Sequence, residues 1–350
     1  MPDRAETTDE REALDLLIRG FQVSRMLRLV ADLAIADKIS EEGCDVRALA
    51  TACGVQVSPL LRVLRALAAF DVFRVRADGH IEHSPRSLLL RTDAPNSMHH
   101  GAKFWTGPGS WRAWGELDVA LQGGVPHEAA WKVGRFQYLR ENPDEARQFD
   151  LFMANFPDNR HAAVAATYDF SAAELVTDVG GGNGATLRHI LAVAPKARGL
   201  VFDRPDVVEA IPAASRLGGR IEVHGGSFFE TVPAGADTYL LVRVLHDWSD
   251  EDCVRILRNC RDAMKPGSRL LIIEQILEPD PKRGRPTSYL VDMQMMAMFG
   301  SARERTKAEF DELLAASDLR GQRLVPTTSP VWIIEAALGK AKPSGESADG

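Results

Sequence analysis

The sequence predicts a doubly wound α/β domain that follows a smaller, mainly helical domain. From about residue 174 onward, short apolar strands alternate with helical stretches, as in parallel sheets with helices on both faces. Before residue 106 the apolar spacing is mainly helical, with one short hairpin signal. We therefore expect an N-terminal domain over 1–105, a Rossmann-like α/β domain over 106–339 and a disordered polar tail over 340–350.

Composition and charge limit the classes of function. The chain has 350 residues, of which 45% are hydrophobic and 26% charged, as in ordinary globular proteins. A net charge of −7 argues against nucleic acid as a partner, and no apolar run approaches the ~18 residues that span a membrane. The four cysteines have no metal-binding spacing, which is typical of free thiols in a reducing compartment. We expect a cytoplasmic protein that binds neither metal, membrane nor nucleic acid.

The N-terminal domain begins with helical spacing. Residues 11–38 are expected to form one or two helices. Within them, the stretch 26–35 is apolar almost all round, which indicates burial against another part of the protein or against a second subunit.

A helix-turn-helix pattern and a hairpin follow. A short helix is predicted over 45–54 and a second over 60–70, with Ser58-Pro59 supplying the N-cap and the first helical position. Residues 73–81 alternate apolar and polar side chains around a two-residue turn, Asp78-Gly79. Together these elements predict a winged helix.

This winged helix is a poor candidate for DNA recognition. On the second helix only Arg62 and Arg65 are placed to meet phosphates, and no Asn or Gln is present to contact base edges. A packing role is therefore favoured over a DNA-binding regulator that senses a ligand, although that alternative stays open.

The middle of the chain, residues 95–170, is expected to be irregular to helical. Its large aromatic side chains belong mostly to a core, and some are expected to line an apolar pocket. These residues are Trp105, Trp111, Trp114, Trp131 and Tyr138.

The α/β domain is predicted from five buried strands followed by an antiparallel closing pair. The intervening helices include 186–194 and 250–264. The strands are expected at 174–179, 200–203, 221–223, 238–242 and 270–274, and the closing pair at 322–325 and 331–336.

A glycine-rich turn follows the first of these strands. Gly180, Gly182 and Gly184 allow a sharp turn and the close approach of a ligand, and Asp203 ends the second strand where a carboxylate can bind ribose hydroxyls. The pattern also fits a dinucleotide site, so an NAD-linked oxidoreductase is an alternative. Asp178 favours S-adenosylmethionine instead, because a carboxylate there would attract its cationic methionine end and repel a pyrophosphate.

The catalytic candidates follow later strands of the same sheet. His246 comes after the fourth strand, at the edge where doubly wound sheets bind ligands, and Glu274 ends the fifth strand at that edge. Glu304 lies in a short polar stretch before a helix. A base with a pKa near ~6.5 suits proton removal from a phenol, and the two glutamates are expected to hold the ring and stabilise the imidazolium.

Four motifs in order resemble a known family. They are Asp178-Val-Gly-Gly-Gly-Asn-Gly184, Phe202-Asp-Arg-Pro205, Val244-Leu-His-Asp-Trp-Ser-Asp250 and Glu304-Arg-Thr306. Across nearly the whole chain, the sequence is similar to small-molecule S-adenosylmethionine-dependent O-methyltransferases, which include plant caffeate and isoflavone enzymes, acetylserotonin O-methyltransferase and bacterial antibiotic-tailoring enzymes.

The resemblance implies a methyltransferase-type sheet, a homodimer formed by the winged-helix domain, and a small hydroxylated aromatic or polyketide-like acceptor. It implies His246 as the base, with Glu274 and Glu304 beside it. It places against the cofactor the residues Gly180, Gly182, Asp203, Gly226, Ser227, Phe228 and Arg243. It places in the acceptor pocket the residues Phe149, Met153, Asp292, Met296 and Phe299.

One position departs from the family pattern. Where the family usually has Gly-Asp-Phe or Gly-Asp-Met, this chain has Gly226-Ser227-Phe228. Serine can hydrogen-bond an adenine amine but carries no charge, so a somewhat lower cofactor affinity is expected.

Methyl transfer to nitrogen or carbon by the same fold is a further alternative. A neutral amine needs a base less than a hydroxyl does, so His246 favours oxygen.

Overall fold

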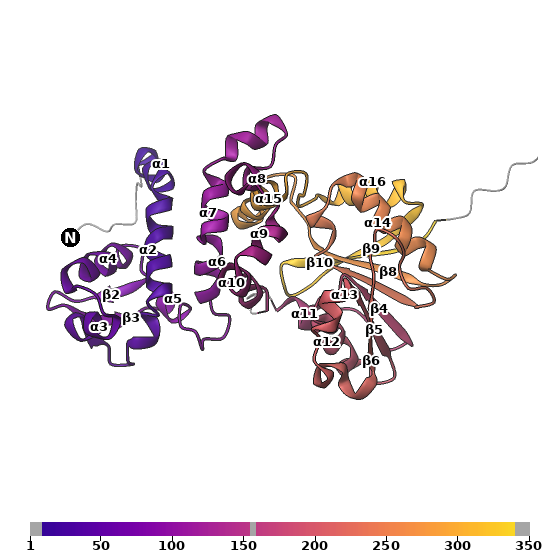
Figure 1. Ribbon diagram of the computed structural model, residues 1–350, viewed down its shortest axis with the longest axis horizontal. Helices are drawn as coiled ribbons and strands as arrows, with labels where there is room; N and C mark the ends of the chain where they lie inside the picture. Colours follow the sequence, from indigo (N-terminus) through magenta and orange to yellow (C-terminus); the bar gives the residue numbers. More distant parts are fainter. Residues whose placement is uncertain (1–8, 155–158, 340–350) are drawn as a thin grey trace, which may run out of the picture. The chain divides into compact units, whose positions relative to one another are not determined.

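The computed structural model describes residues 9–154 and 159–339. Contacts group these residues into two compact units (Figure 1): an N-terminal unit of 9–116 and 127–154, and a sheet unit of 117–126 and 159–339. The contacts group 106–116 and 127–154 with the N-terminal unit, beyond the domain limit predicted at residue 105. That limit stays a prediction. The predicted tail lies outside the described residues. Within the described ranges, no helix is long and apolar enough to cross a membrane.

The N-terminal unit opens with two helices that leave apolar side chains exposed. The helices are α1 (Glu10–Ile18) and α2 (Gly20–Asp32), followed by the 3-10 turn η1 (Ala36–Lys38). Val30 and Ile35 are buried, but Leu29 is exposed and Leu17 is 78% exposed. The stretch 26–35 is thus only partly covered by its own chain. The exposed apolar side chains on these helices are Leu14, Leu16, Leu17, Ile18, Phe21 and Leu29.

The predicted helix-turn-helix and hairpin are confirmed, with two local corrections. The elements are β1 (Cys44–Asp45), α3 (Val46–Cys53), α4 (Val57–Ala68), β2 (Phe73–Val75) and β3 (His80–His83). Helix α4 begins one residue before the predicted cap, with Gln56 as N-cap, because a proline is tolerated anywhere in a first helical turn. The hairpin loop has three residues rather than two: Arg76 and His80 pair, and Gly79 takes a φ of +88°.

The middle of the chain is helical, and its aromatic side chains pack on one another. Trp131 lies 4.5 Å from the Tyr138 ring, Arg112 lies 4.2 Å from the Trp131 ring, and Trp105 packs edge-on against Phe152. These contacts support the core role predicted for most of them. The helices are α5 (Pro85–Leu88), α6 (His99–Trp105), α7 (Pro108–Trp114), α8 (Pro126–Trp131), α9 (Arg135–Glu141) and α10 (Pro143–Ala154).

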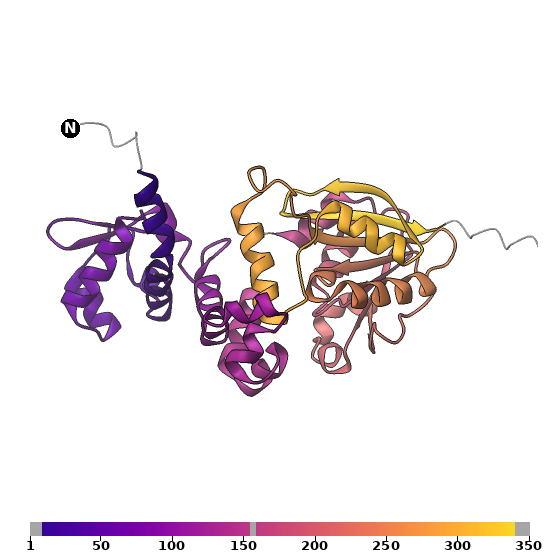
Figure 2. The same ribbon diagram turned by 90° about the horizontal axis from the view of Figure 1, so that it is seen from above.

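The sheet unit contains a seven-stranded sheet in which only β10 is antiparallel to β8 and β9, as predicted for the closing pair. The order is β6-β5-β4-β7-β8-β10-β9. Figures 1 and 2 show the C-terminal strands, in yellow, at one edge. The strands are β4 (Leu175–Val179), β5 (Arg198–Asp203), β6 (Ile221–Gly225), β7 (Thr238–Val242), β8 (Arg269–Gln275), β9 (Leu319–Pro326) and β10 (Val331–Leu338).

Helices cover both faces of this sheet. Alternate residues of each strand point to opposite faces, so Tyr239 and Leu241 pack with α14 and α16, whereas Leu240 packs with α11 and α12. The helices are α11 (Arg160–Thr167), α12 (Ala185–Val193), α13 (Pro205–Glu209), α14 (Asp250–Ala263), α15 (Pro286–Phe299) and α16 (Lys307–Ala316). The 3-10 turns are η2 (Leu117–Gln122), η3 (Ala213–Gly219) and η4 (Leu245–Asp247).

The strand order positions a ligand site. Strand β4 pairs with β5 on one side and with β7 on the other, so the chain reverses its direction of travel across the sheet between them. At such a switch point the connections leave in opposite directions and open a crevice at the carboxyl ends of the strands. The glycine turn follows β4, and His246 follows β7, at this edge.

Candidate active site

The glycine turn after β4 has a backbone that only glycine adopts without strain. Gly180, Gly182 and Gly184 have φ values of +73°, +54° and +74°. A Cβ atom on Gly180 would lie 2.9 Å from a methyl group of Val244, which belongs to the segment that carries His246. Gly184 is the N-cap of α12, so the turn leads directly into the N-terminus of that helix.

Asp178 is a buried carboxylate without a counter-charge in its hydrogen-bonding shell. Its residue is 1% exposed, and among the described residues neither side-chain oxygen has a hydrogen-bond partner. Burial, and then the negative charge of Asp203, raise the pKa of Asp178 to about 7. A buried carboxylate in this state is costly for the protein and favours a cationic ligand group.

Asp203 is fixed by backbone donors. Its Oδ2 accepts a hydrogen bond from the N–H of Gly182 at 2.9 Å, and its Oδ1 accepts one from the N–H of Arg204 at 2.7 Å. The carboxylate at the end of β5 is therefore tied to the glycine turn at the end of β4. This agrees with the placement predicted from their spacing in the sequence.

The segment Gly226-Ser227-Phe228 lies next to Asp203. The N–H of Gly226 donates to the Asp203 carbonyl at 2.9 Å. The Ser227 hydroxyl accepts from the N–H of Phe229 at 3.3 Å, and the Phe228 ring packs edge-on against Trp248. Ser227 thus shapes its own turn, and its effect on cofactor affinity stays a prediction.

Arg243 binds two carboxylates of the chain itself. Its Nη1 donates to Glu274 Oε2 at 2.9 Å and to Glu304 Oε2 at 3.0 Å, and its Nη2 donates to Glu304 Oε1 at 2.6 Å. Burial lowers the pKa of Arg243, but Glu304 and Glu274 outweigh it and raise that pKa far above its usual range. The observed partners of Arg243 are these glutamates, and its predicted place at the cofactor stays a prediction.

His246 lies in η4 and is held by Glu274. The residue is 9% exposed, and its Nδ1 lies 3.1 Å from Glu274 Oε2, while Glu274 Oε1 accepts the N–H of Leu245 at 2.9 Å. One carboxylate therefore fixes both the ring and the backbone beside it. Because Glu274 accepts at Nδ1, the neutral ring carries its proton there and leaves Nε2 able to accept one.

The second carboxylate beside the ring is not the predicted one. The structure places Glu304 against Arg243, and Asp247 Oδ1 lies 3.3 Å from His246 Nε2. The tight η4 turn brings the neighbouring side chain back onto the ring. Sequence reasoning missed Asp247, although its position directly after His246 was the available signal.

The charges around His246 favour its protonated form. Burial and Arg243 lower the pKa of His246, but Asp247 and Glu274 outweigh them and raise it above its ordinary value. Burial alone would raise the pKa of Glu274, but His246 and Arg243 lower it to about 2. Glu274 is thus a permanent anion that stabilises an imidazolium after His246 has taken a proton.

The predicted acceptor residues lie in both units. Phe149 and Met153 belong to α10 of the N-terminal unit, where Phe149 contacts Phe104. In the sheet unit, Asp292 Oδ1 accepts the N–H of Glu304 at 2.9 Å, and Met296 and Phe299 are half-buried on α15. Their common role in an acceptor pocket stays a prediction.

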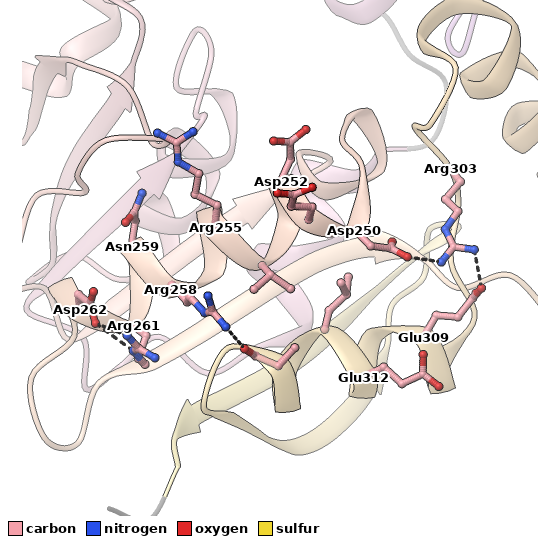
Figure 3. A pocket seen from close by; sticks show the side chains of 14 residues that line it. Asp250, Asp252, Arg255, Arg258, Asn259, Arg261, Asp262, Arg303, Glu309 and Glu312 are labelled. Atoms are coloured by element: carbon pink, nitrogen blue, oxygen red, sulfur yellow. Dashed lines mark hydrogen bonds and ion pairs between the residues drawn. The ribbon is translucent and has the colours of Figure 1, made fainter. Parts of the chain in front are cut away.

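A surface groove of about 750 Å³ lies elsewhere, along α14 and α16 (Figure 3). Charged side chains dominate its lining, and several bind one another: Arg303 donates to Asp250 and Glu309, and Arg258 donates to the carbonyl of Ala316. His246, Asp178 and the glycines are absent from its lining. This groove is therefore distinct from the candidate active site.

Comparison with known proteins agrees with this geometry. Residues 114–319 match the model of an O-methyltransferase domain, and residues 16–90 match that of an O-methyltransferase dimerisation domain. The chain is 37% identical to phenazine O-methyltransferase of Lysobacter antibioticus, over 91% of this chain and 94% of that protein.

Two further similarities bear on the cofactor and the acceptor. The fold matches CalO1, a methyltransferase in calicheamicin biosynthesis solved with SAH bound, with a TM-score of 0.82, 30% identity and coverage of 95% of this chain and all of that one. The chain is also 31% identical to 8-amino-8-demethylriboflavin N,N-dimethyltransferase of Streptomyces davaonensis, over 97% of this chain and 99% of that protein.

Proposed function

The chain belongs to the O-methyltransferase family, and on that basis we propose that it transfers a methyl group from S-adenosylmethionine to a hydroxyl of a small aromatic or polyketide-like molecule, with His246 as general base. The observation that carries the proposal is the contact of His246 Nδ1 with the Glu274 carboxylate, at the same sheet edge as the glycine turn. The family does not support the NAD-linked oxidoreductase that the glycine pattern also allowed.

The residues at the end of β4 fit S-adenosylmethionine. The buried Asp178 carboxylate, which has no hydrogen-bond partner among the described residues, suits the ammonium group of the methionine end. Gly180 and Gly182 leave the backbone open to close approach, and Asp203 offers a fixed carboxylate to the ribose hydroxyls. When bound, the cofactor supplies a methyl carbon activated by a sulfonium. Gly226, Ser227 and Phe228 are assigned to its adenine end.

His246 then has one task, which is to take the acceptor's proton. Its Nε2 accepts the hydroxyl proton as the oxygen attacks, and Glu274 at Nδ1 and Asp247 near Nε2 stabilise the imidazolium that forms. Glu304 acts one step away, because it holds Arg243, which in turn binds Glu274. Phe149, Met153, Asp292, Met296 and Phe299 are assigned to the acceptor pocket.

A nitrogen acceptor is the second candidate, because a relative of similar length is an N,N-dimethyltransferase. A neutral amine attacks without prior loss of a proton, so it gains less from a base than a hydroxyl does. The carboxylate-bound His246 therefore favours oxygen. A panel of matched hydroxyl- and amino-aromatic compounds with radiolabelled S-adenosylmethionine tests this choice. Label on oxygen supports the proposal, and label confined to nitrogen would replace it.

We infer a homodimer in the cytoplasm as the working state. The match to a dimerisation domain and the exposed apolar side chains of α1 and α2, among them Leu17 and Ile18, support the dimer. The four cysteines are free thiols, as is usual in a reducing compartment. The dimerisation match also favours the packing role of the winged helix over a DNA-binding one, and no nucleic-acid partner is assigned.

The pH dependence of the reaction tests the link between Glu274 and His246. The base works only when neutral, so kcat/KM should rise with pH, with an inflection above 6.5 because the neighbouring carboxylates raise the pKa of His246. Glu274→Gln removes a negative charge at Nδ1, so the inflection should move to lower pH while the plateau rate falls by about tenfold or more. Initial rates across the pH range check both.

Glu335→Gln is the matched control for that measurement. Glu335 is also a buried carboxylate of this sheet, but it lies on β10 and binds Arg269 of β8 and Arg323 of β9. Its loss should leave the inflection in place. An unmoved inflection in Glu274→Gln would mean that His246 does not set the acid limb.

A further inference from the structure

Arg305 is a fully buried arginine directly after Glu304. The residue is 0% exposed, and its guanidinium is held by Asp250, whose Oδ1 accepts from Nε at 2.9 Å and from Nη2 at 2.8 Å. Asp250 is the first residue of α14, so Arg305 ties its own segment to the start of that helix. Two donors of the planar guanidinium contact the same carboxylate oxygen, and this restricts the orientation of the Arg305 side chain.

The guanidinium of Arg305 also donates to backbone carbonyls on both sides of His246. Nη1 donates to the Leu245 carbonyl at 2.8 Å, and Nη2 donates to the Trp248 carbonyl at 2.8 Å. The Leu245 carbonyl also accepts from the Cys253 thiol at 3.2 Å. The Leu245 carbonyl also accepts the N–H of Trp248 across the turn at 3.2 Å, so Arg305 is an additional buried donor to it. The Trp248 carbonyl lies just after the turn, and a buried donor there satisfies a group that would otherwise be costly.

The same two-residue segment holds the other parts of the catalytic network. Glu304 binds Arg243 at the start of the turn, and Arg243 has a φ of +54°, a strained value for a residue that is not glycine. The carbonyl of Arg305 accepts the N–H of Leu277, three residues after Glu274 along the chain. The segment Glu304-Arg305 thus contacts both the turn that carries His246 and the residues just after β8, the strand that carries Glu274.

We propose that Arg305 is the positioning residue that sets the imidazole of His246 against the acceptor hydroxyl. It touches neither the ring nor any reacting atom, and acts by fixing the carbonyls of Leu245 and Trp248 relative to Glu304 and β8. The inference rests on the proposed role of His246 as base. A displacement of about 1 Å at a reacting group costs on the order of 100-fold in rate, so a looser turn should lower kcat without changing cofactor binding.

The test is a double-mutant cycle with His246. Arg305→Lys keeps the positive charge but lacks the fork that reaches two carbonyls and Asp250 at once. It should lower kcat by about 10- to 100-fold with KM for S-adenosylmethionine unchanged. In a His246→Ala background, where no ring remains to be positioned, the same substitution should change the residual rate by less than about twofold. Single-turnover rates with labelled cofactor are measured for the wild type, the two single variants and the double variant.

Two controls separate positioning from loss of structure. Asp250→Asn weakens the anchor of the guanidinium while both carbonyl contacts persist, so it should give a smaller loss of kcat that is likewise absent in the His246→Ala background. If Arg305→Lys does not fold, the Asp250→Asn result tests the positioning role in its place. Arg258→Lys, on the charged groove of Figure 3, changes an arginine that donates to the Ala316 carbonyl and should leave kcat unchanged.

The outcomes distinguish this inference from the proposed function. Losses that multiply, with Arg305→Lys lowering the rate equally in both backgrounds, would overturn the positioning role while leaving His246 as base. A kcat within about twofold of wild type for Arg305→Lys would overturn it as well. Full activity of His246→Ala alone would instead refute the base assignment, and with it this inference.

Discussion

Replacing His246 by alanine should lower kcat by at least about 100-fold and leave the affinity for S-adenosylmethionine unchanged. His246 follows β7 and its ring contacts Glu274 and Asp247, whereas Asp178 and Asp203, the residues proposed to bind the cofactor, belong to β4 and β5. Loss of the base removes an interaction that matters in the transition state and not in cofactor binding. Isothermal titration calorimetry and steady-state rates check the two halves of this prediction.

The loss should shrink as the acceptor hydroxyl becomes more acidic. A phenol that is already ionised at the assay pH needs no base, so electron-poor acceptors should be partly rescued in the variant. His80→Ala is a suitable control, because His80 lies in the N-terminal hairpin and its ring contacts the Glu42 carbonyl at 2.9 Å. Equal losses for acidic and ordinary phenols would argue that His246 acts by binding the acceptor rather than by taking its proton.

Asp178→Asn should make the cofactor-free protein more stable and a poorer binder of S-adenosylmethionine. The difference between a folded pKa of about 7 and an unfolded pKa near 3.8 corresponds to roughly 4 kcal/mol of destabilisation above pH 7. A buried amide without partners keeps roughly 1–3 kcal/mol of that cost, so the net gain should be roughly 1–3 kcal/mol. Cofactor affinity should fall by about tenfold or more, because a charged partner of its ammonium is lost.

The sign of the pH dependence follows from the raised pKa. Between about pH 4 and pH 7 the folded protein binds more protons at Asp178 than the unfolded chain does, so this group's effect on stability becomes more unfavourable as pH rises and then levels off. Cofactor binding has the opposite trend and should tighten through pH 7 as the carboxylate forms. Denaturant unfolding at pH 6 and pH 8, with and without cofactor, measures both.

A partnered carboxylate provides the control for Asp178. Asp237 Oδ2 accepts the N–H groups of Glu174 and Leu175 at 2.8 and 2.9 Å, before β7 begins and at the opposite edge of the sheet. Asp237→Asn should lose stability rather than gain it and leave cofactor affinity unchanged. If Asp178→Asn is instead destabilised, its carboxylate has a stabilising partner in the free protein, and its assignment to the cofactor falls.

The sequence alone determined the sheet and the position of the ligand edge. Buried parallel strands are short apolar runs separated by helices, and this signal is local, so all seven strands were predicted and confirmed. The glycine turn was equally readable, because a positive φ at Gly180, Gly182 and Gly184 requires a residue without Cβ. Where a boundary depended on turn geometry, the prediction missed by two residues at the start of α4 and by one residue in the hairpin loop at Gly79.

Only the tertiary structure decided which charged groups meet. Ionisable side chains from three separate segments, 243–247, 274 and 304–305, contact one another in the folded chain. Which of them pair depends on distances of a few ångströms that periodicity does not encode. In the structure, Glu304 binds Arg243, whereas Glu274 and Asp247 lie beside His246. Arg305 binds the backbone around His246. Coulomb energies in a buried site change steeply over such distances, so partner choice belongs to the folded geometry rather than to the sequence pattern.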